Sequence, residues 1–242
     1  MKNGHKKIFL LFALLSAVAA ALNSSVPAQG QSSCGCQDIK DLRSRACSAS
    51  AAVAEWDRQI RRTRSQEEKS GQVEMMTATV KSEVDSCVDL MISLHHNQGE
   101  NPRDANPWTG QNDPASRAGG ATSDATCEMT VNAPTTCLAD VIRAHENVHV
   151  QSCRYQNENR NLLQRYLMDF RLGFSSTTWM LEERTAYEVE HQFVLTRLRE
   201  LSQRCPKSFF EVPKKGGGRE FTLEWCPQRK PSPKEMENCK RQ

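Results

Sequence analysis

Two histidines and a glutamate stand close together in the middle of the chain, at a spacing that suits metal chemistry. His145 and His149 are four residues apart, which is about one turn of an α-helix, so both imidazoles leave the same face of the helix. Imidazoles placed in this way can share a tetrahedral zinc ion at about 2.0–2.1 Å. Glu146 points to the side of this pair, where its carboxylate can reach a water molecule beside the ion without binding the ion itself. The spacing predicts a zinc site with a base next to it, and the alternative is a pair of core histidines that hydrogen-bond inside the protein.

The residues at positions 145–149 read His-Glu-Asn-Val-His and resemble the signature of the zincin superfamily of metallopeptidases. The resemblance implies that Glu146 is the general base, which takes a proton from water and passes it to the leaving amine of the peptide. The metzincin branch is excluded, because Ser152 and Tyr155 stand where that branch has a glycine and its third histidine.

A catalytic zinc site needs a third protein ligand, and a later helix offers one. Glu183 follows Trp179 by four residues and precedes Tyr187 by four, so it faces the buried side of that helix, where a carboxylate without a partner is costly. The arrangement resembles the glutamate-ligand branch of the zincins, the gluzincins, and the resemblance implies that Glu183 binds the metal. Glu182 and then His191 are the alternative ligands, and an ion pair with an arginine is the alternative role for Glu183.

Tyr187 is the second catalytic candidate after Glu146. It stands where the best-known gluzincins often carry an aspartate, four residues after the glutamate ligand, and this departs from their pattern. Its hydroxyl could hydrogen-bond a ligand histidine or the oxyanion that develops during hydrolysis. An ordinary core tyrosine is the alternative.

Apolar residues at helical spacing predict the two helices that carry these residues. One begins at Thr135 or Thr136, either of which can cap it, and runs to about Leu167. The other covers about 176–203. Under the zincin interpretation these helices pack side by side with the metal between them.

The remaining pattern predicts a mainly α fold with one or two short strands. Amphipathic stripes over residues 38–60 and 73–94 predict two helices in a hairpin that turns near residue 67. Residues 98–126 are rich in Pro, Gly, Asn, Asp and Ser and read as a surface loop. Alternation over 127–131 predicts one short strand. The predicted fold class is a disulfide-stapled, zincin-like helical domain.

The beginning of the chain has the layout of a secretory signal peptide. Three lysines precede an apolar run from Ile8 to Leu22, and small and polar residues follow up to Ala28. Removal of this segment takes away three positive charges and no acidic residue, so the net charge of +3 falls to zero. This balance argues against a nucleic-acid partner, and no apolar run is long enough for stable membrane insertion. We expect a secreted or periplasmic protein.

Ten cysteines follow the predicted signal peptide, and an even number in an oxidising compartment predicts disulfides. If two antiparallel helices turn near residue 67, Cys47 and Cys87 lie level with each other, which predicts a disulfide between them. Pairings of Cys127 with Cys137 and of Cys153 with Cys205 would hold the motif helix in place.

The chain therefore divides into five predicted segments. These are a signal peptide (1–28), a helical hairpin segment (29–97), a loop or linker (98–126), a zincin-like catalytic core (127–204) and a cysteine-containing C-terminal tail (205–242).

Two hypotheses for the function follow. The first is a secreted peptidase that requires Zn²⁺ and hydrolyses peptide bonds of a peptide or protein substrate, with His145, His149 and Glu183 as metal ligands. The second is a disulfide-stapled helical binding module without catalysis, since the segment 29–97 contains no catalytic signature. Glu146 helps to separate them, because a purely structural metal site has no need of a carboxylate beside its histidine. The oligomeric state and the exact substrate do not follow from the sequence.

Overall fold

A computed structural model describes the chain from Cys34 onward, within one compact unit, Cys34–Gln242. The described residues are 34–71, 78–96, 119–159, 176–214, 216–224, 226 and 239. The predicted signal peptide, most of the predicted loop and the last predicted turns of the motif helix lie outside them. No helix in the described part of the chain is long and apolar enough to cross a membrane.

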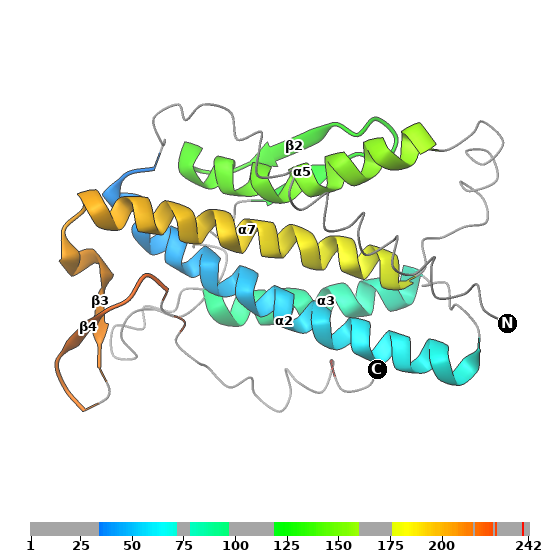
Figure 1. Cartoon of the computed structure of the whole chain (residues 1–242), viewed down its shortest axis with the longest axis horizontal. Coiled ribbons are helices and arrows are strands. Elements are labelled where there is room, and N and C mark those ends of the chain that lie inside the picture. Colours follow the sequence, from blue (N-terminus) through cyan, green and yellow to red (C-terminus); the bar gives the residue numbers. More distant parts are fainter. Residues whose placement is uncertain are drawn as a thin grey trace, which may run out of the picture. The chain divides into compact units, whose positions relative to one another are not determined.

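Long helices dominate the described residues, which confirms the predicted mainly α fold (Figure 1). Helix α7 packs against both α2 and α5, and α2 also packs against α3. The predicted hairpin segment and the predicted catalytic core are thus joined along α7. A short 3-10 turn, η1 (Cys36–Asp38), leads into the first of the helices, which are α2 (Ile39–Ser70), α3 (Ala78–His96), α5 (Thr136–Asn159) and α7 (Ser176–Arg204).

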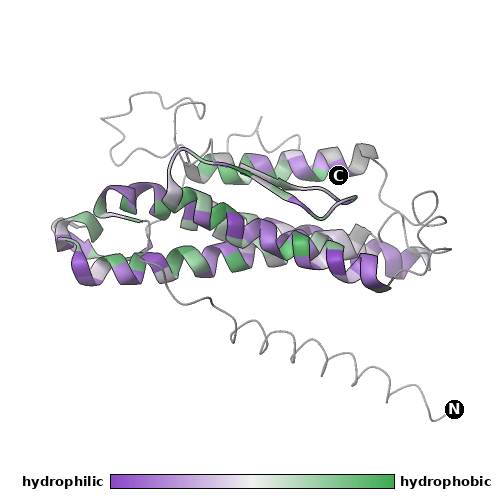
Figure 2. Ribbon diagram, turned by 90° about the horizontal axis from the view of Figure 1, so that it is seen from above, coloured by the Kyte–Doolittle hydropathy of each residue, from purple (hydrophilic) through white to green (hydrophobic). Residues whose placement is uncertain are grey.

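The helices bury apolar stripes and leave most of their charged residues outside, and Figure 2 shows the two kinds of residue alternating around the ribbons. One core cluster lies where α2, α5 and α7 meet and includes Leu42, Val141 and Leu198. A second cluster joins α2, α3 and α7 and includes Trp56 and Met180. Each fully buried side chain of this kind contributes about 1.5–3 kcal/mol, so these clusters hold α7 in the register that the site needs.

Two small antiparallel sheets accompany the helices. Strands β1 (Gly119–Thr122) and β2 (Met129–Asn132) pair with each other, as do β3 (Glu211–Pro213) and β4 (Arg219–Phe221). The strand predicted over 127–131 is present as β2, displaced by one or two residues. Strand β1 falls in the segment predicted as loop, because Gly-Gly-Ala-Thr carries no alternation and becomes a strand only through its partner.

Five disulfides are formed by the ten cysteines, which confirms the prediction of a disulfide-stapled domain. The two cysteines beside Gly35 connect the N-terminal end of the described chain to the first turn of α5 and to the residue after α7. The pairs are Cys34–Cys137, Cys36–Cys205, Cys47–Cys226, Cys87–Cys239 and Cys127–Cys153.

The predicted Cys47–Cys87 disulfide is wrong, because the helical hairpin turns later than expected. Helix α2 continues to Ser70 and ends at Gly71 in the left-handed conformation, so the chain reverses beyond residue 71. Ile60 then packs in one cluster with residues of α3 on either side of Cys87, and Cys47 lies about 20 Å further along α2 at 1.5 Å per residue.

The predicted pairs Cys127–Cys137 and Cys153–Cys205 are also wrong, and the lengths of the elements explain why. The extended chain from Cys127 to the start of α5 covers about 26 Å at 3.3 Å per residue. The helix then returns by about the same length between Thr136 and Cys153. Cys127 therefore lies level with Cys153, while Cys137 stays at the opposite end of the helix and bonds to Cys34.

Candidate metal centre

The first turn of α5 is held by Thr135, one of the two predicted caps. Its side-chain oxygen accepts a hydrogen bond from the backbone N–H of Leu138 at 3.2 Å, and its carbonyl accepts from Ala139. These bonds satisfy donors that otherwise have no partner at a helix start. The helix then places His145 and His149 on the face that packs against α7.

The Nε2 atoms of the two histidines face each other and the carboxylate of Glu183 on α7. The distance between the two Nε2 atoms is 3.4 Å, and Oε1 of Glu183 lies 3.8 Å from Nε2 of His149. All three ligand atoms lie within 4.8 Å of one another. Ligands at about 2.0–2.1 Å from a tetrahedral ion lie about 3.3–3.4 Å apart, so the three atoms have almost the spacing of a zinc site.

The opposite edge of each imidazole meets a different carboxylate. Nδ1 of His149 lies 2.8 Å from Oε1 of Glu182, and the other oxygen of that carboxylate, Oε2, accepts a hydrogen bond from Ser152. Nδ1 of His145 lies 3.0 Å from Oε2 of Glu190, although its N–H does not point directly at that oxygen. A carboxylate at Nδ1 favours the tautomer that leaves Nε2 free to bind a metal.

Glu190 is fully buried and is held from the predicted hairpin segment. Arg45 on α2 donates to both of its carboxylate oxygens. Burial raises the pKa of Glu190, but Arg45 and His145 outweigh this effect and lower it overall, so the carboxylate stays charged. Helix α2 is therefore part of the support of His145.

The site carries more negative than positive charge, which suits a divalent cation. Burial raises the pKa of Glu183 against the opposing effect of the two histidines. Burial lowers the pKa of His149, but the hydrogen bond that its ring donates to Glu182 and the negative charges around it raise the pKa overall. Among the described residues the site gathers four carboxylates, those of Glu146, Glu182, Glu183 and Glu190, around the two histidines and Arg45.

Glu146 is buried beside the histidines and is positioned by strand β1. Thr122 donates a hydrogen bond to Oε2 of Glu146 at 2.8 Å. Gly120 lies so close that an added Cβ atom would stand 2.5 Å from Cγ of Glu146, which explains a glycine at this position. The carboxylate does not belong to the group of three ligand atoms, as expected for a base rather than a ligand.

Tyr187 packs its ring edge-on against His145, with 4.6 Å between the ring centroids. Burial raises the pKa of its hydroxyl, so the phenol stays protonated and can only act as a neutral hydrogen-bond donor or acceptor. The contact with His145 is one of packing, and the structure assigns the hydroxyl no hydrogen bond among the described residues.

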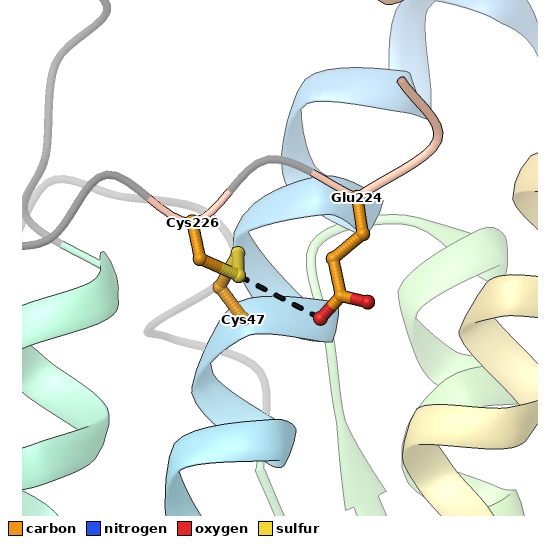
Figure 3. A group of neighbouring side chains, drawn as sticks. All are labelled: Cys47, Glu224 and Cys226. Carbon is orange, nitrogen blue, oxygen red and sulfur yellow. Dashed lines mark hydrogen bonds between the residues drawn. A yellow bond between two sulfur atoms is a disulfide. The ribbon is translucent and has the colours of Figure 1, made fainter.

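The two alternative third ligands lie elsewhere. Glu182 faces Nδ1 of His149, not the convergent Nε2 atoms. Nε2 of His191 lies 3.1 Å from Glu224, beside the Cys47–Cys226 disulfide (Figure 3). This second group of possible ligands, formed by Glu224 and the two cysteines, offers no thiolate because both sulfurs are bonded to each other.

Sequence reasoning did not identify Arg45, Gly120, Thr122 and Glu190 as parts of the site. Glu190 follows Glu183 by seven residues, about two helical turns, and this spacing placed it on the same face of the helix. The other three come from distant segments and carry no local signal.

Comparisons of the chain with models of protein families, with curated proteins and with solved structures find no match. The geometry of the site is therefore the basis for the function proposed below.

Proposed function

We propose that the chain is an extracytoplasmic zinc-dependent metallopeptidase in which His145, His149 and Glu183 bind the metal and Glu146 is the general base. The supporting observation is the convergence of two Nε2 atoms and one carboxylate oxygen, with the opposite edges of both imidazoles turned to carboxylates. Two histidines paired only for the stability of the core would not need a third, half-buried carboxylate facing them.

Bound zinc would supply Lewis acidity toward a carbonyl oxygen and toward water. Glu146 would take the proton of the attacking water and deliver it to the leaving amine. Thr122 orients this carboxylate through its hydrogen bond. Tyr187, kept neutral by burial, would be the candidate donor to the oxyanion.

Strand β1 would align an extended peptide substrate. It pairs with β2 on one side, and within the described residues no strand pairs with its other edge. Because β1 also carries the residues that touch Glu146, a segment added to that edge would pass beside the base. Main-chain hydrogen bonds of this kind bind a substrate with little dependence on its sequence.

The proposed location outside the cytoplasm is supported by five disulfides, since cytosolic proteins rarely keep such bonds. The lysines and apolar run at the start of the sequence point the same way.

The first test is the zinc content per chain, measured by mass spectrometry on the oxidised protein without its leader. We expect one zinc in the parent and its loss in His149→Ala and Glu183→Ala. Glu188→Ala is the matched control, because Glu188 lies on α7 but pairs with Arg184 at the surface. A folded parent that binds no zinc would contradict the proposal.

The second test is hydrolysis of an unstructured protein such as casein. We expect Glu146→Gln to keep its zinc and to lose roughly 10²–10⁴-fold in rate, the usual contribution of a general base. Zinc binding without any hydrolysis by the parent would favour the alternative, a non-catalytic binding module.

A further inference from the structure

A cavity of about 260 Å³ opens beside the candidate metal centre, between α2, α3 and α7. Glu183 and Tyr187 line it, so it shares a wall with the three ligand atoms. Its volume is below the roughly 300–1,000 Å³ of sites for drug-sized molecules. The size suits one side chain of a longer ligand.

Part of the cavity lining is aromatic and already carries a cation. Trp56 and Trp179 meet edge to face, with 5.1 Å between their ring centroids. The ammonium of Lys81, an exposed residue at the edge of the cavity, lies 4.5 Å from the centroid of Trp179. The face of this indole is thus accessible to a positive charge, which it attracts through its π electrons.

Trp56 also lines the cavity, but it offers little surface to a ligand. Its side chain is 2% exposed, and its buried Nε1–H has no hydrogen-bond partner in the described structure. The indole face that a ligand can reach is therefore that of Trp179.

Two carboxylates on α3 complete the cavity. Asp85 and Asp89 are one helical turn apart, and like charges at this spacing repel each other. Among the residues described by the structure, neither makes an ion pair within 4.0 Å or a side-chain hydrogen bond. Burial raises the pKa of both. Together with Glu183, they give the cavity three carboxylates against one ammonium, that of Lys81, whose charge only partly offsets the rise in the pKa of Asp85.

We propose that this cavity binds the basic side chain, arginine or lysine, of a substrate residue next to the scissile bond. The inference rests on the proposed peptidase function, because Glu183 belongs to both the cavity and the metal centre. A guanidinium fits best, since it can stack on an indole and bond to carboxylates at its edge. An acidic side chain would be repelled by the three carboxylates, and an apolar one would leave them without a partner.

The test uses blocked hexapeptide pools that are randomised except for one residue, fixed as arginine, citrulline or glutamate. Citrulline has the shape of arginine without its charge. We expect the parent to cleave the arginine pool at least about tenfold faster, in kcat/KM, than the citrulline pool, in keeping with a desolvated cation–π contact. The double variant Asp85→Asn/Asp89→Asn should lose this preference while it keeps its zinc.

The matched control is Glu83→Gln, an exposed residue of the same helix outside the cavity, which should keep the preference for arginine. Equal cleavage of the arginine and citrulline pools by the parent would overturn the inference and leave the peptidase function standing.

If no pool is cleaved, the peptidase function is contradicted, and the cavity proposal is then tested by peptide binding. Binding of the same pools to Glu146→Gln is followed by tryptophan fluorescence, since Trp56 and Trp179 line the cavity. Affinity for the arginine pool about tenfold above that for citrulline, lost in the Asp85→Asn/Asp89→Asn background, would support a basic side-chain site. Equal affinities would overturn it.

Discussion

The roles of the single residues at this site depend on which edge of each imidazole faces which carboxylate. His149 presents Nε2 to His145 and Glu183, and Nδ1 to Glu182. Two adjacent glutamates thus have different tasks: Glu183 faces the convergent atoms, and Glu182 fixes the orientation of the ring. The difference predicts unequal effects when each of them is changed.

Glu182→Gln should weaken zinc binding by roughly 10–100-fold, the usual effect of losing a carboxylate that supports a ligand histidine. The fold should persist, because Glu182 is partly exposed and glutamine keeps its shape. Competition with a chelator of known affinity measures the effect on oxidised protein. Glu188→Gln on the same helix is the control, and an unchanged affinity in Glu182→Gln would show that the ring needs no such support.

Zinc affinity should also fall as the pH is lowered, over a range set by the pKa of His149. A histidine binds the metal only in its neutral form, so protons compete below its pKa and cease to compete above it. The pKa of His149 is raised from its ordinary 6.5, so the loss of affinity should begin at a higher pH than for an unperturbed histidine. Zinc titrations over a pH series measure this.

The same titrations on Glu182→Gln provide the control for that prediction. The hydrogen bond that His149 donates to Glu182 is the largest of the effects that raise the pKa of His149, so the pH at which affinity is lost should move downward in this variant. A pH profile that does not move would assign the titration to another group.

At the scale of elements, the contact of β1 with α5 determines where the carboxylate of Glu146, the proposed base, points. Gly120 sits against the side chain of Glu146, and Thr122 bonds to its carboxylate. The Cys127–Cys153 disulfide ties the end of the hairpin loop to α5, so the strand cannot slide along the helix. A strand of four residues with two glycines has little stability of its own and depends on this attachment.

Gly120→Ala should reduce activity without loss of zinc. The added methyl would stand 2.5 Å from Cγ of Glu146, so the base must turn away, and a displacement of about 1 Å can cost roughly 100-fold in rate. Gly119→Ala is the matched control, since nothing lies within 4 Å of a Cβ atom there. The rates and the zinc content of the two variants are compared. Equal rates would show that β1 does not position the proposed base.

At the scale of the whole molecule, the segment that carries no catalytic signature supports the site. Helix α2 packs along α7 and delivers Arg45 to Glu190. Disulfides from Cys34 and Cys36 attach the start of α2 to α5 and to the end of α7. The hairpin also forms a wall of the cavity beside the metal centre. The hairpin is therefore a structural part of the candidate site.

Arg45→Met should therefore weaken both folding and metal binding, because Arg45 holds Glu190, which lies against the proposed ligand His145. Removal of one partner of a buried ion pair costs about 3–5 kcal/mol, because the other charge stays buried alone. Denaturant unfolding and zinc titration measure the two effects. Arg62→Met, at an exposed position of the same helix, is the control. If Arg45→Met binds zinc as tightly as the parent, α2 does not support the metal site through Arg45.

The features of this protein that depend on local spacing could be predicted from the sequence alone. His145 and His149 share a helix face because four residues make one turn. Glu183 could be chosen over its neighbour because Trp179 and Tyr187 mark the buried side of α7. The four helices and the use of the cysteines in disulfides follow from periodicity and from an even cysteine count. These inferences need no knowledge of how the elements pack.

The disulfide pairs and the partners that orient the candidate ligands depend on distances between elements, so they are known only from the tertiary structure. The three predicted disulfides were wrong because they rest on the position of a turn and on the direction in which a strand returns along a helix. Arg45 lies 145 residues from Glu190, and Thr122 lies 24 residues from Glu146. Neither partner affects the other until α2 packs on α7 and β1 packs on α5. The spacing in the sequence predicts candidate ligands, whereas the partners that orient them come from segments brought together by burial of the apolar faces.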